Sequence, residues 1–228
     1  MNLSLRASIV IPAHKPVSIL RSCCESIIKN TNLNEVEVIV VCNGSDRESA
    51  EYVTSLGSPF KLIWIPEALG FTKAVNIGFE LAQAPHTITL NTDVILLDQP
   101  KNSWLDRLLT PFTDPMVGLT GCNKMWFHGA EFFPFWCVAI RSSLFRQIGY
   151  LDLAFSPGYH EDADYCFRVA KYGYKLVHVA TETEDPINKI YVTDFPIYHK
   201  GEGSFTDNDS RNQLLQRNAE IIVRRWFQ

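Results

Sequence analysis

The stretch Val36-Glu37-Val38-Ile39-Val40-Val41 decides the fold. It is almost continuously apolar and rich in β-branched residues, which is typical of a parallel strand buried on both faces. Comparable strand-like runs occur at residues 7–11, 61–65 and 87–90. Amphipathic segments with helical periodicity separate them, at residues 17–29, 46–56 and 71–84. The order β-α-β-α-β-α-β within the first 90 residues therefore predicts an α/β fold with a parallel sheet and right-handed crossovers.

Polar residues follow three of these predicted strands. They are Pro12-Ala13-His14, Asn43-Gly44 and Asn91-Thr92-Asp93. In open α/β sheets the ligand binds outside the carboxyl ends of the strands. We therefore expect these three segments to line one crevice.

The second half of the chain is more mixed. We expect strands at 117–121, 135–140, 175–179 and 197–199, and helices at 142–148 and 162–172. The polar, glycine-containing residues 200–210 predict a mobile loop, and an amphipathic helix follows at 211–227. With 228 residues, 46% of them hydrophobic, the chain can bury a substantial core as one domain.

Composition and missing motifs exclude several classes. The net charge of −4 argues against a nucleic-acid partner. The sequence has no apolar run long enough to span a membrane and no signal-peptide pattern at its start. Its six cysteines form no C-x-x-C pair, so we expect buried free thiols in a reducing compartment. No dinucleotide-binding G-x-G-x-x-G, P-loop or G-x-S-x-G motif is present.

Three residues can carry chemistry. Asp93 follows a strand, where a carboxylate can ligate Mg²⁺ or Mn²⁺ shared with a diphosphate, or can simply bond to its own turn. Asp162 opens a helix, where it can be the N-cap and can also act as a general base. His199 closes a late strand and can complete the metal site or have a structural role only.

Five short motifs occur in a recognisable order, and His199 follows them at the expected place. They are Ser8–His14, Val40–Ser45, Leu69-Gly70-Phe71 with Asn76-Ile77-Gly78, Leu90–Val94, and Glu161–Tyr165. In this order the chain resembles a family 2 glycosyltransferase over roughly residues 7–205. The resemblance implies a GT-A fold, in which a Rossmann-like, mostly parallel central sheet is flanked by helices and joined by a smaller mixed acceptor-side subregion. It also implies an inverting transferase of EC class 2.4.

The resemblance assigns roles to individual residues. Asp162 matches the general base, while Asp93 and His199 match ligands of Mn²⁺ or Mg²⁺. The donor-binding residues that it implies are Pro12, Ala13, His14, Asn43, Lys73, Asn76, Asn91 and Thr92. Asn91 replaces the first aspartate of the D-x-D metal motif, and Cys42-Asn43 replaces the usual aspartate after the second strand. One domain, 1–228, would contain a nucleotide-sugar half (1–98), an acceptor-side half (99–205) and a C-terminal loop and helix (206–228).

The implied partners are a nucleotide-diphosphate sugar, with UDP or dTDP as the expected nucleotide, and a glycan, lipid-linked or protein acceptor. The resemblance therefore implies a role in surface glycan synthesis. The protein would work in the cytoplasm, either at the inner face of the membrane or away from it. Two other classes stay open. One is a weakly catalytic nucleotide-sugar-binding partner of another transferase, which Asn91 favours. The other is a sugar nucleotidyltransferase, which would need a glycine-rich loop where this chain has Pro12–Pro16.

Two further segments have alternative interpretations. The residues 125–136 are densely aromatic, and they can form core or present a surface to the acceptor or to a lipid carrier. The final helix, with apolar residues beside Arg224-Arg225-Trp226, can pack on the domain or dock on a partner or a membrane surface. This ending resembles the basic and aromatic termini of some family members.

Overall fold

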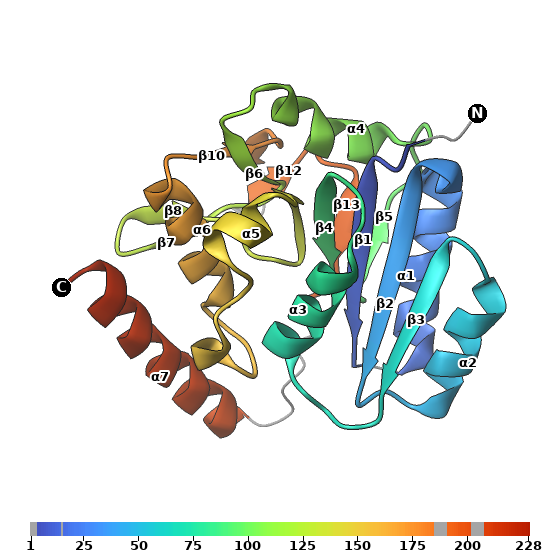
Figure 1. The fold of residues 1–228 in the computed structure, drawn as a ribbon, viewed down its shortest axis with the longest axis horizontal. Helices are drawn as coiled ribbons and strands as arrows, with labels where there is room; N and C mark the ends of the chain where they lie inside the picture. Colours follow the sequence, from blue (N-terminus) through green and yellow to red (C-terminus); the bar gives the residue numbers. More distant parts are fainter. Residues whose placement is uncertain (1–3, 15, 185–190, 202–207) are drawn as a thin grey trace.

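A seven-stranded sheet forms the centre of the protein, described here as a computed structural model in which residues 4–14, 16–184, 191–201 and 208–228 are placed (Figure 1). In spatial order its strands are β10 (Lys175–His178), β6 (Val117–Gly121), β9 (Cys137–Arg141), β4 (His86–Leu90), β1 (Ala7–Ala13), β2 (Val36–Asn43) and β3 (Phe60–Ile65). The pairs β1–β2, β2–β3 and β1–β4 are parallel, so the predicted parallel sheet is confirmed. Strand β9 runs antiparallel to both of its neighbours.

Helices cover both faces of this sheet. They are α1 (Val17–Asn30), α2 (Arg47–Leu56), α3 (Phe71–Leu81), α4 (Ser103–Leu109), α5 (Leu144–Ile148), α6 (Glu161–Lys171) and α7 (Asn208–Trp226), with short 3₁₀ turns at Leu33–Glu35, Thr110–Thr113 and Leu153–Phe155. Side chains alternate between two cores: Ile9 and Ile11 pack with α1, α2 and α4, while Val10 packs with α3, α6 and α7. This two-sided burial explains why the strand sequences are almost wholly apolar.

Three two-stranded sheets lie beside the central sheet in the described part of the chain. They pair β5 (Val94–Leu96) with β13 (Ile197–His199), β7 (Met125–Phe127) with β8 (Ala130–Phe132), and β11 (Glu182–Glu184) with β12 (Tyr191–Thr193). The β5–β13 pair is antiparallel and places His199 opposite Val94. It therefore joins the end of the chain's second half to the turn that follows β4.

Several element boundaries differ from the sequence prediction. Helix α3 ends at Leu81 rather than at residue 84, because the chain turns extended at Ala82 ahead of Pro85. Helix α7 already includes residues 208–210 of the predicted loop, and residues 202–207 lie outside the described part of the chain. All six cysteines are buried and free, as predicted. None of the described helices is both long and apolar enough to cross a membrane.

Candidate active site

The carboxyl ends of β1 and β2 carry the residues predicted to bind the donor, here called the donor-side wall. His14 contacts the backbone oxygen of Asn43 through Nδ1 at 2.8 Å, so Nδ1 is the donor and Nε2 is the ring nitrogen not used in this bond. The Asn43 side-chain oxygen accepts the backbone N–H of Leu69. Ser45 donates its hydroxyl to the backbone oxygen of Ala13 at 2.7 Å. These bonds tie the two strand ends to the segment that leads into α3.

The turn after β4 holds the predicted metal-binding carboxylate. Asp93 is only 8% exposed, and its Oδ1 lies 3.5 Å from Nε2 of His199. The backbone fixes this pair, because β5 begins directly after Asp93 and β13 ends at His199. In addition, Lys200 donates its N–H to the Asp93 backbone oxygen at 2.9 Å. Two residues more than one hundred positions apart in the sequence are thus brought together, as the resemblance implied.

This pair suits a divalent cation with oxygen and nitrogen ligands. A carboxylate and an imidazole are donors that Mn²⁺ accepts, and Asn91 adds a buried side-chain oxygen, Oδ1, that has no hydrogen-bond partner in the structure. Among the described residues, no group of three His, Cys, Asp or Glu side chains converges as a complete protein cage. Nucleotide-bound cations typically have about two protein ligands, and phosphate oxygens and water complete their coordination shell.

The candidate base, Asp162, lies in the first turn of α6 and is partly exposed. The predicted N-cap role is wrong, because His160 occupies that position and Asp162 is the second residue of the helix. Its Oδ1 instead accepts the N–H of Ala163 at 2.8 Å. Burial raises the pKa of Asp162 to about 6, against the opposing effect of backbone N–H bonds from Ala163 and Phe135. A carboxylate with this pKa is a better proton acceptor near neutral pH than an ordinary aspartate.

Glu161, next to the candidate base, is buried at 4% exposure, and its Oε2 has no hydrogen-bond partner in the structure. Burial, and then the charge of Asp162, raise the pKa of Glu161 well above its usual range. Glu161 therefore retains its proton more readily than Asp162 does. Asp162 is the more exposed of the two carboxylates.

Phe135 and Trp136 lie directly before β9, next to residues of the candidate site. The backbone oxygen of Trp136 accepts the N–H of Asn91 at 3.0 Å, and the Trp136 ring stacks on His199 with centroids 4.6 Å apart and planes 10° apart. The backbone N–H of Phe135 lies near enough to Asp162 to lower the pKa of that carboxyl. Sequence reasoning missed this role; the available signal was an aromatic pair at the start of the strand predicted at 135–140.

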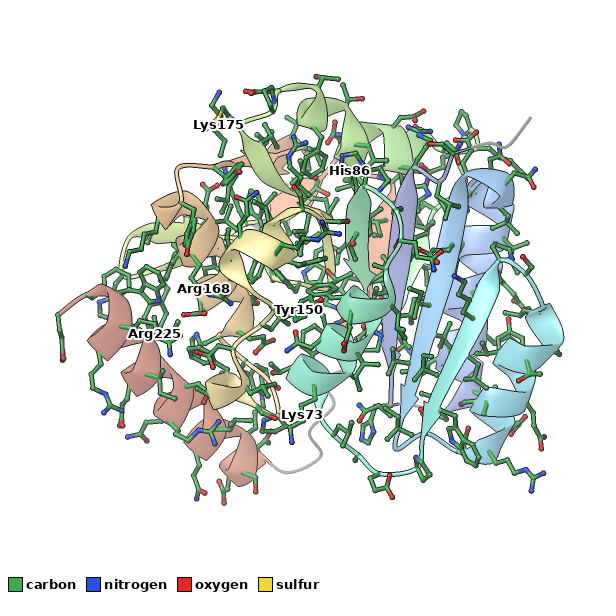
Figure 2. All side chains as sticks on the ribbon, in the orientation of Figure 1. Lys73, His86, Tyr150, Arg168, Lys175 and Arg225 are labelled. Atoms are coloured by element: carbon green, nitrogen blue, oxygen red, sulfur yellow. The ribbon has the colours of Figure 1, made fainter. Side chains whose placement is uncertain are left out.

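The remaining predicted donor residues have varied surroundings. Lys73 is exposed at the N-terminal end of α3, on the lower side of the molecule in Figure 2. The side chain of Asn76 donates to the Leu151 backbone oxygen at 2.8 Å and accepts the Leu151 N–H at 3.0 Å, so its visible task is to tie α3 to the acceptor-side half. Ala13 and Thr92 are buried at the strand ends, and Pro12 is partly buried on β1.

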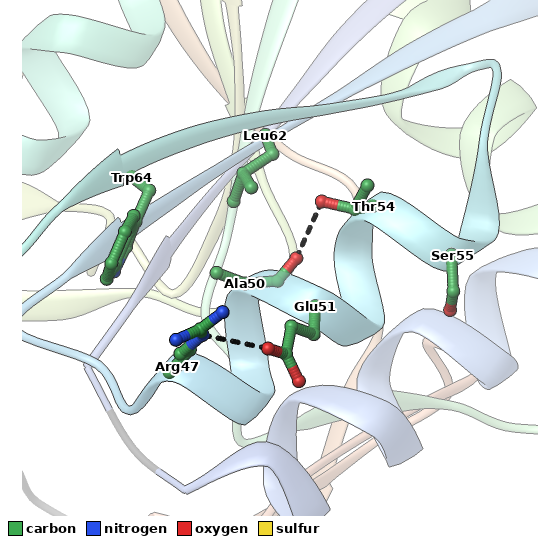
Figure 3. Close-up of a pocket in the computed structure, with 7 residues that line it drawn as sticks. All are labelled: Arg47, Ala50, Glu51, Thr54, Ser55, Leu62 and Trp64. Atoms are coloured by element: carbon green, nitrogen blue, oxygen red, sulfur yellow. Dashed lines mark hydrogen bonds and ion pairs between the residues drawn. The ribbon is translucent and has the colours of Figure 1, made fainter.

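A separate shallow groove lies between α2 and the edge strand β3 (Figure 3). It is lined by Arg47, Ala50, Glu51, Thr54, Ser55, Leu62 and Trp64. Arg47 and Glu51 form an ion pair of 2.9 Å on its rim. None of the predicted site residues lines this groove.

The sequence matches the family described as "Glycosyl transferase family 2" over residues 8–167. Among curated proteins it is 28% identical over 127 residues to the O-antigen biosynthesis protein RfbC of Myxococcus xanthus, a match covering 54% of this chain and 10% of that protein. It is 26% identical over 200 residues to the pre-mycofactocin glycosyltransferase of Mycobacterium tuberculosis, covering 74% and 40% respectively. The chain thus spans less than half the length of these relatives.

Two solved structures have the same fold. A mannosyltransferase from Pyrobaculum calidifontis, PcManGT, in complex with GDP-Man and Mn²⁺, superimposes with a TM-score of 0.62 at 17% identity, covering 77% of this chain and 55% of that one. GalNAc-T7 with UDP, GalNAc and Mn²⁺ superimposes with a TM-score of 0.66 at 17% identity, covering 77% and 42%. The predicted GT-A fold is confirmed.

Proposed function

Because the chain belongs to glycosyl transferase family 2, we propose that it moves a sugar from a nucleotide-diphosphate donor to an acceptor hydroxyl, with inversion at the anomeric carbon. UDP or dTDP is the expected nucleotide, and surface glycan synthesis on the cytoplasmic side of a membrane is the expected setting. Residues 1–98 would bind the donor and 99–205 the acceptor, in one domain that 206–228 completes. The nucleotide-diphosphate ligands of the structural neighbours support this donor class.

One observation carries the proposal: Trp136 stacks on His199, which lies 3.5 Å from Asp93, while the backbone N–H of the neighbouring Phe135 is near enough to Asp162 to lower the pKa of that carboxyl. In a direct displacement, a base removes the acceptor proton on one side of the sugar while charge develops on the diphosphate on the other. Asp162 is the base in this scheme, and it takes the proton onto its carboxylate as the acceptor oxygen attacks. No covalent bond to the protein is needed for inversion.

The opposite side of the site would hold the diphosphate. Asp93 and His199, with Asn91 beside them, would bind Mn²⁺ or Mg²⁺, which when present stabilises the negative charge of the leaving group. Lys73, at the start of α3, would add a cation near the phosphates. The nucleotide's heterocyclic base would lie against the donor-side wall of Pro12, Ala13, His14 and Asn43. Asn76 and Thr92 would support the ribose and the phosphates.

The test is a donor screen. Purified protein is incubated with a panel of nucleotide sugars, with Mn²⁺ or with EDTA, and release of nucleotide diphosphate is measured with and without candidate acceptors. We expect release from one donor that needs the cation, is lost in Asp162→Asn, and is accompanied by weaker cation-dependent donor binding in Asp93→Ala. Donor binding without release in any combination would instead support a nucleotide-sugar-binding partner of another transferase, the reading that Asn91 favours.

A further inference from the structure

The C-terminal helix α7 has a buried asparagine facing the segment that leads to the candidate base. Asn218 is fully buried, and its side-chain nitrogen lies 3.1, 2.9 and 2.8 Å from the backbone oxygens of Phe155, Gly158 and Tyr159, so its two N–H groups are shared among three carbonyls. The neighbouring Arg217 donates to the backbone oxygen of Ser156 at 2.7 Å. Four of the five consecutive carbonyls of residues 155–159 thus receive hydrogen bonds from two adjacent residues of α7.

This loop, Phe155–His160, has a backbone that needs outside support. Tyr159 and His160 both adopt left-handed conformations, with φ of 72° and 68°, although neither is glycine. Such residues persist where surrounding contacts hold them in place. The loop leads directly into Glu161 and Asp162, so its shape sets where the candidate base begins.

The same loop also packs against the donor-side half. The backbone oxygen of Pro157 accepts the N–H of Thr72, in the first turn of α3, at 3.3 Å. A Cβ on Gly70 would lie 2.4 Å from the Cβ of Pro157, so the two backbones are in close contact there. The loop therefore lies between α7, the start of α3 and the start of α6, as the lower part of Figure 1 shows.

Helix α7 is itself firmly attached at its far end. Arg225 forms ion pairs with Asp164 at 2.7 Å and with Asp152 at 2.8 Å, and the Trp226 indole N–H donates to Asp164 at 3.1 Å (Arg225 is labelled in Figure 2). Asp164 is fully buried on α6, two residues after the candidate base. Ile222, one turn beyond Asn218, is fully buried in the hydrophobic core to which α6 and α7 both contribute.

We propose that Asn218 is a positioning residue: it holds the Phe155–His160 loop in the one shape that presents Asp162 to the acceptor hydroxyl. The proposal rests on the proposed function for the role of Asp162. An amide suits the position because it donates two N–H groups to carbonyls, whereas an aspartate of the same shape offers only acceptors and would face carbonyl oxygens. The final helix is thus part of the acceptor side of the site, and its packing on the domain is the interpretation that the contacts support.

The test compares Asn218→Ala and Asn218→Asp with Ile222→Ala, which loosens α7 by removing apolar packing and leaves the three loop bonds intact. Transfer kinetics, donor affinity by calorimetry and amide hydrogen exchange of the loop are measured well below the melting temperature of each variant. For Asn218→Ala we expect kcat to fall at least tenfold, donor Kd to change less than twofold, and loop amides to exchange faster. For Asn218→Asp we expect a larger loss of kcat. Ile222→Ala should keep kcat within twofold.

Equal losses of kcat in Asn218→Ala and Ile222→Ala would overturn the proposal, since the asparagine would then act through stability alone. Unchanged exchange of the loop amides in Asn218→Ala would overturn it as well. If Asn218→Ala does not fold, Arg217→Ala, at an exposed position, removes one loop bond and should lower kcat by a smaller factor with donor Kd unchanged. The exchange measurement does not depend on activity, so a wild-type protein without transferase activity would defeat the proposed function and leave the structural part of this test intact.

Discussion

Replacing the candidate base, Asp162, with asparagine should stabilise the protein at neutral pH while abolishing transfer. Folding raises the pKa of this carboxyl from 3.8 to about 6, chiefly because of burial. A group whose pKa is raised by folding stabilises the native state below the unfolded pKa, and this contribution is lost as the pH rises through the folded pKa. Above about pH 6 the native protein therefore bears the cost of a partly buried charge.

The size of the effect follows from that shift. The rise of the Asp162 pKa from 3.8 to about 6 corresponds to a free energy of ~3 kcal/mol at most. Because the carboxyl is partly exposed and its charge interacts with Glu161, we expect a gain of ~1–2 kcal/mol. Asparagine keeps the oxygen that accepts the Ala163 N–H, so this hydrogen bond is retained. The loss of a general base should lower kcat by a factor of roughly 10² to 10⁴.

Urea unfolding of both proteins at pH 7.5 and near pH 4 measures the difference. We expect Asp162→Asn to have the higher free energy of unfolding at pH 7.5 and an advantage that disappears near pH 4. Asp114→Asn is the matched control, because Lys175 holds the pKa of that exposed carboxyl below its usual value and its replacement should destabilise slightly at pH 7.5. A stability of Asp162→Asn that is equal to or below the wild type at pH 7.5 would refute the argument.

Three further variants test other parts of the structure. Trp136→Ala removes the ring stacked on His199, so calorimetry should show Mn²⁺ binding weakened about tenfold. Trp136→Phe should lose less Mn²⁺ affinity. Unchanged Mn²⁺ affinity in both variants would show that Trp136 does not support the metal site. Gly78→Ala places a Cβ 2.2 Å from Val10 Cγ1, at the contact of α3 with β1, so urea unfolding should show a loss of ~1–3 kcal/mol despite the better helix propensity of alanine. Trp126 is 58% exposed on β7, so Trp126→Ala should leave stability within ~0.5 kcal/mol and raise the acceptor KM; an unchanged KM would exclude acceptor stacking there.

The sequence predicted the donor-side half in detail because local signals were consistent there. The near-continuous apolar pattern of residues 36–41 indicated a strand buried on both faces, and β2 is buried along its whole length. Polar residues at the ends of adjacent parallel strands must meet at one edge of the sheet, which is where Asn43 and Asp93 lie. For these elements, periodicity and topology rules were sufficient.

The second half of the chain could not be predicted to the same extent, because its geometry depends on contacts distant in sequence. The short strands β7 and β8 have three residues each, too few for periodicity to reveal. The position of Asp162 within α6 depends on the left-handed pair Tyr159-His160, and nothing in the local sequence marks that pair. The aromatic segment divides as expected between core and surface, with Phe133 fully buried and the side chain of Trp126 mostly exposed.

The one antiparallel strand among the described strands of the central sheet explains why Phe135 and Trp136 lie at the same edge as Asp93. Ligand sites of parallel sheets lie at the carboxyl edge, so a parallel strand in the position of β9 would place its first residues at the opposite edge. Because β9 is antiparallel, its start pairs with the end of β4, with Cys137 opposite Leu90. Phe135 and Trp136 therefore enter the sheet at the edge where Asp93 lies, and there the Trp136 ring stacks on His199 and the backbone N–H of Phe135 lies near Asp162. The direction of one strand thus brings Trp136 beside the turn after β4, which no sequence motif taken alone would show.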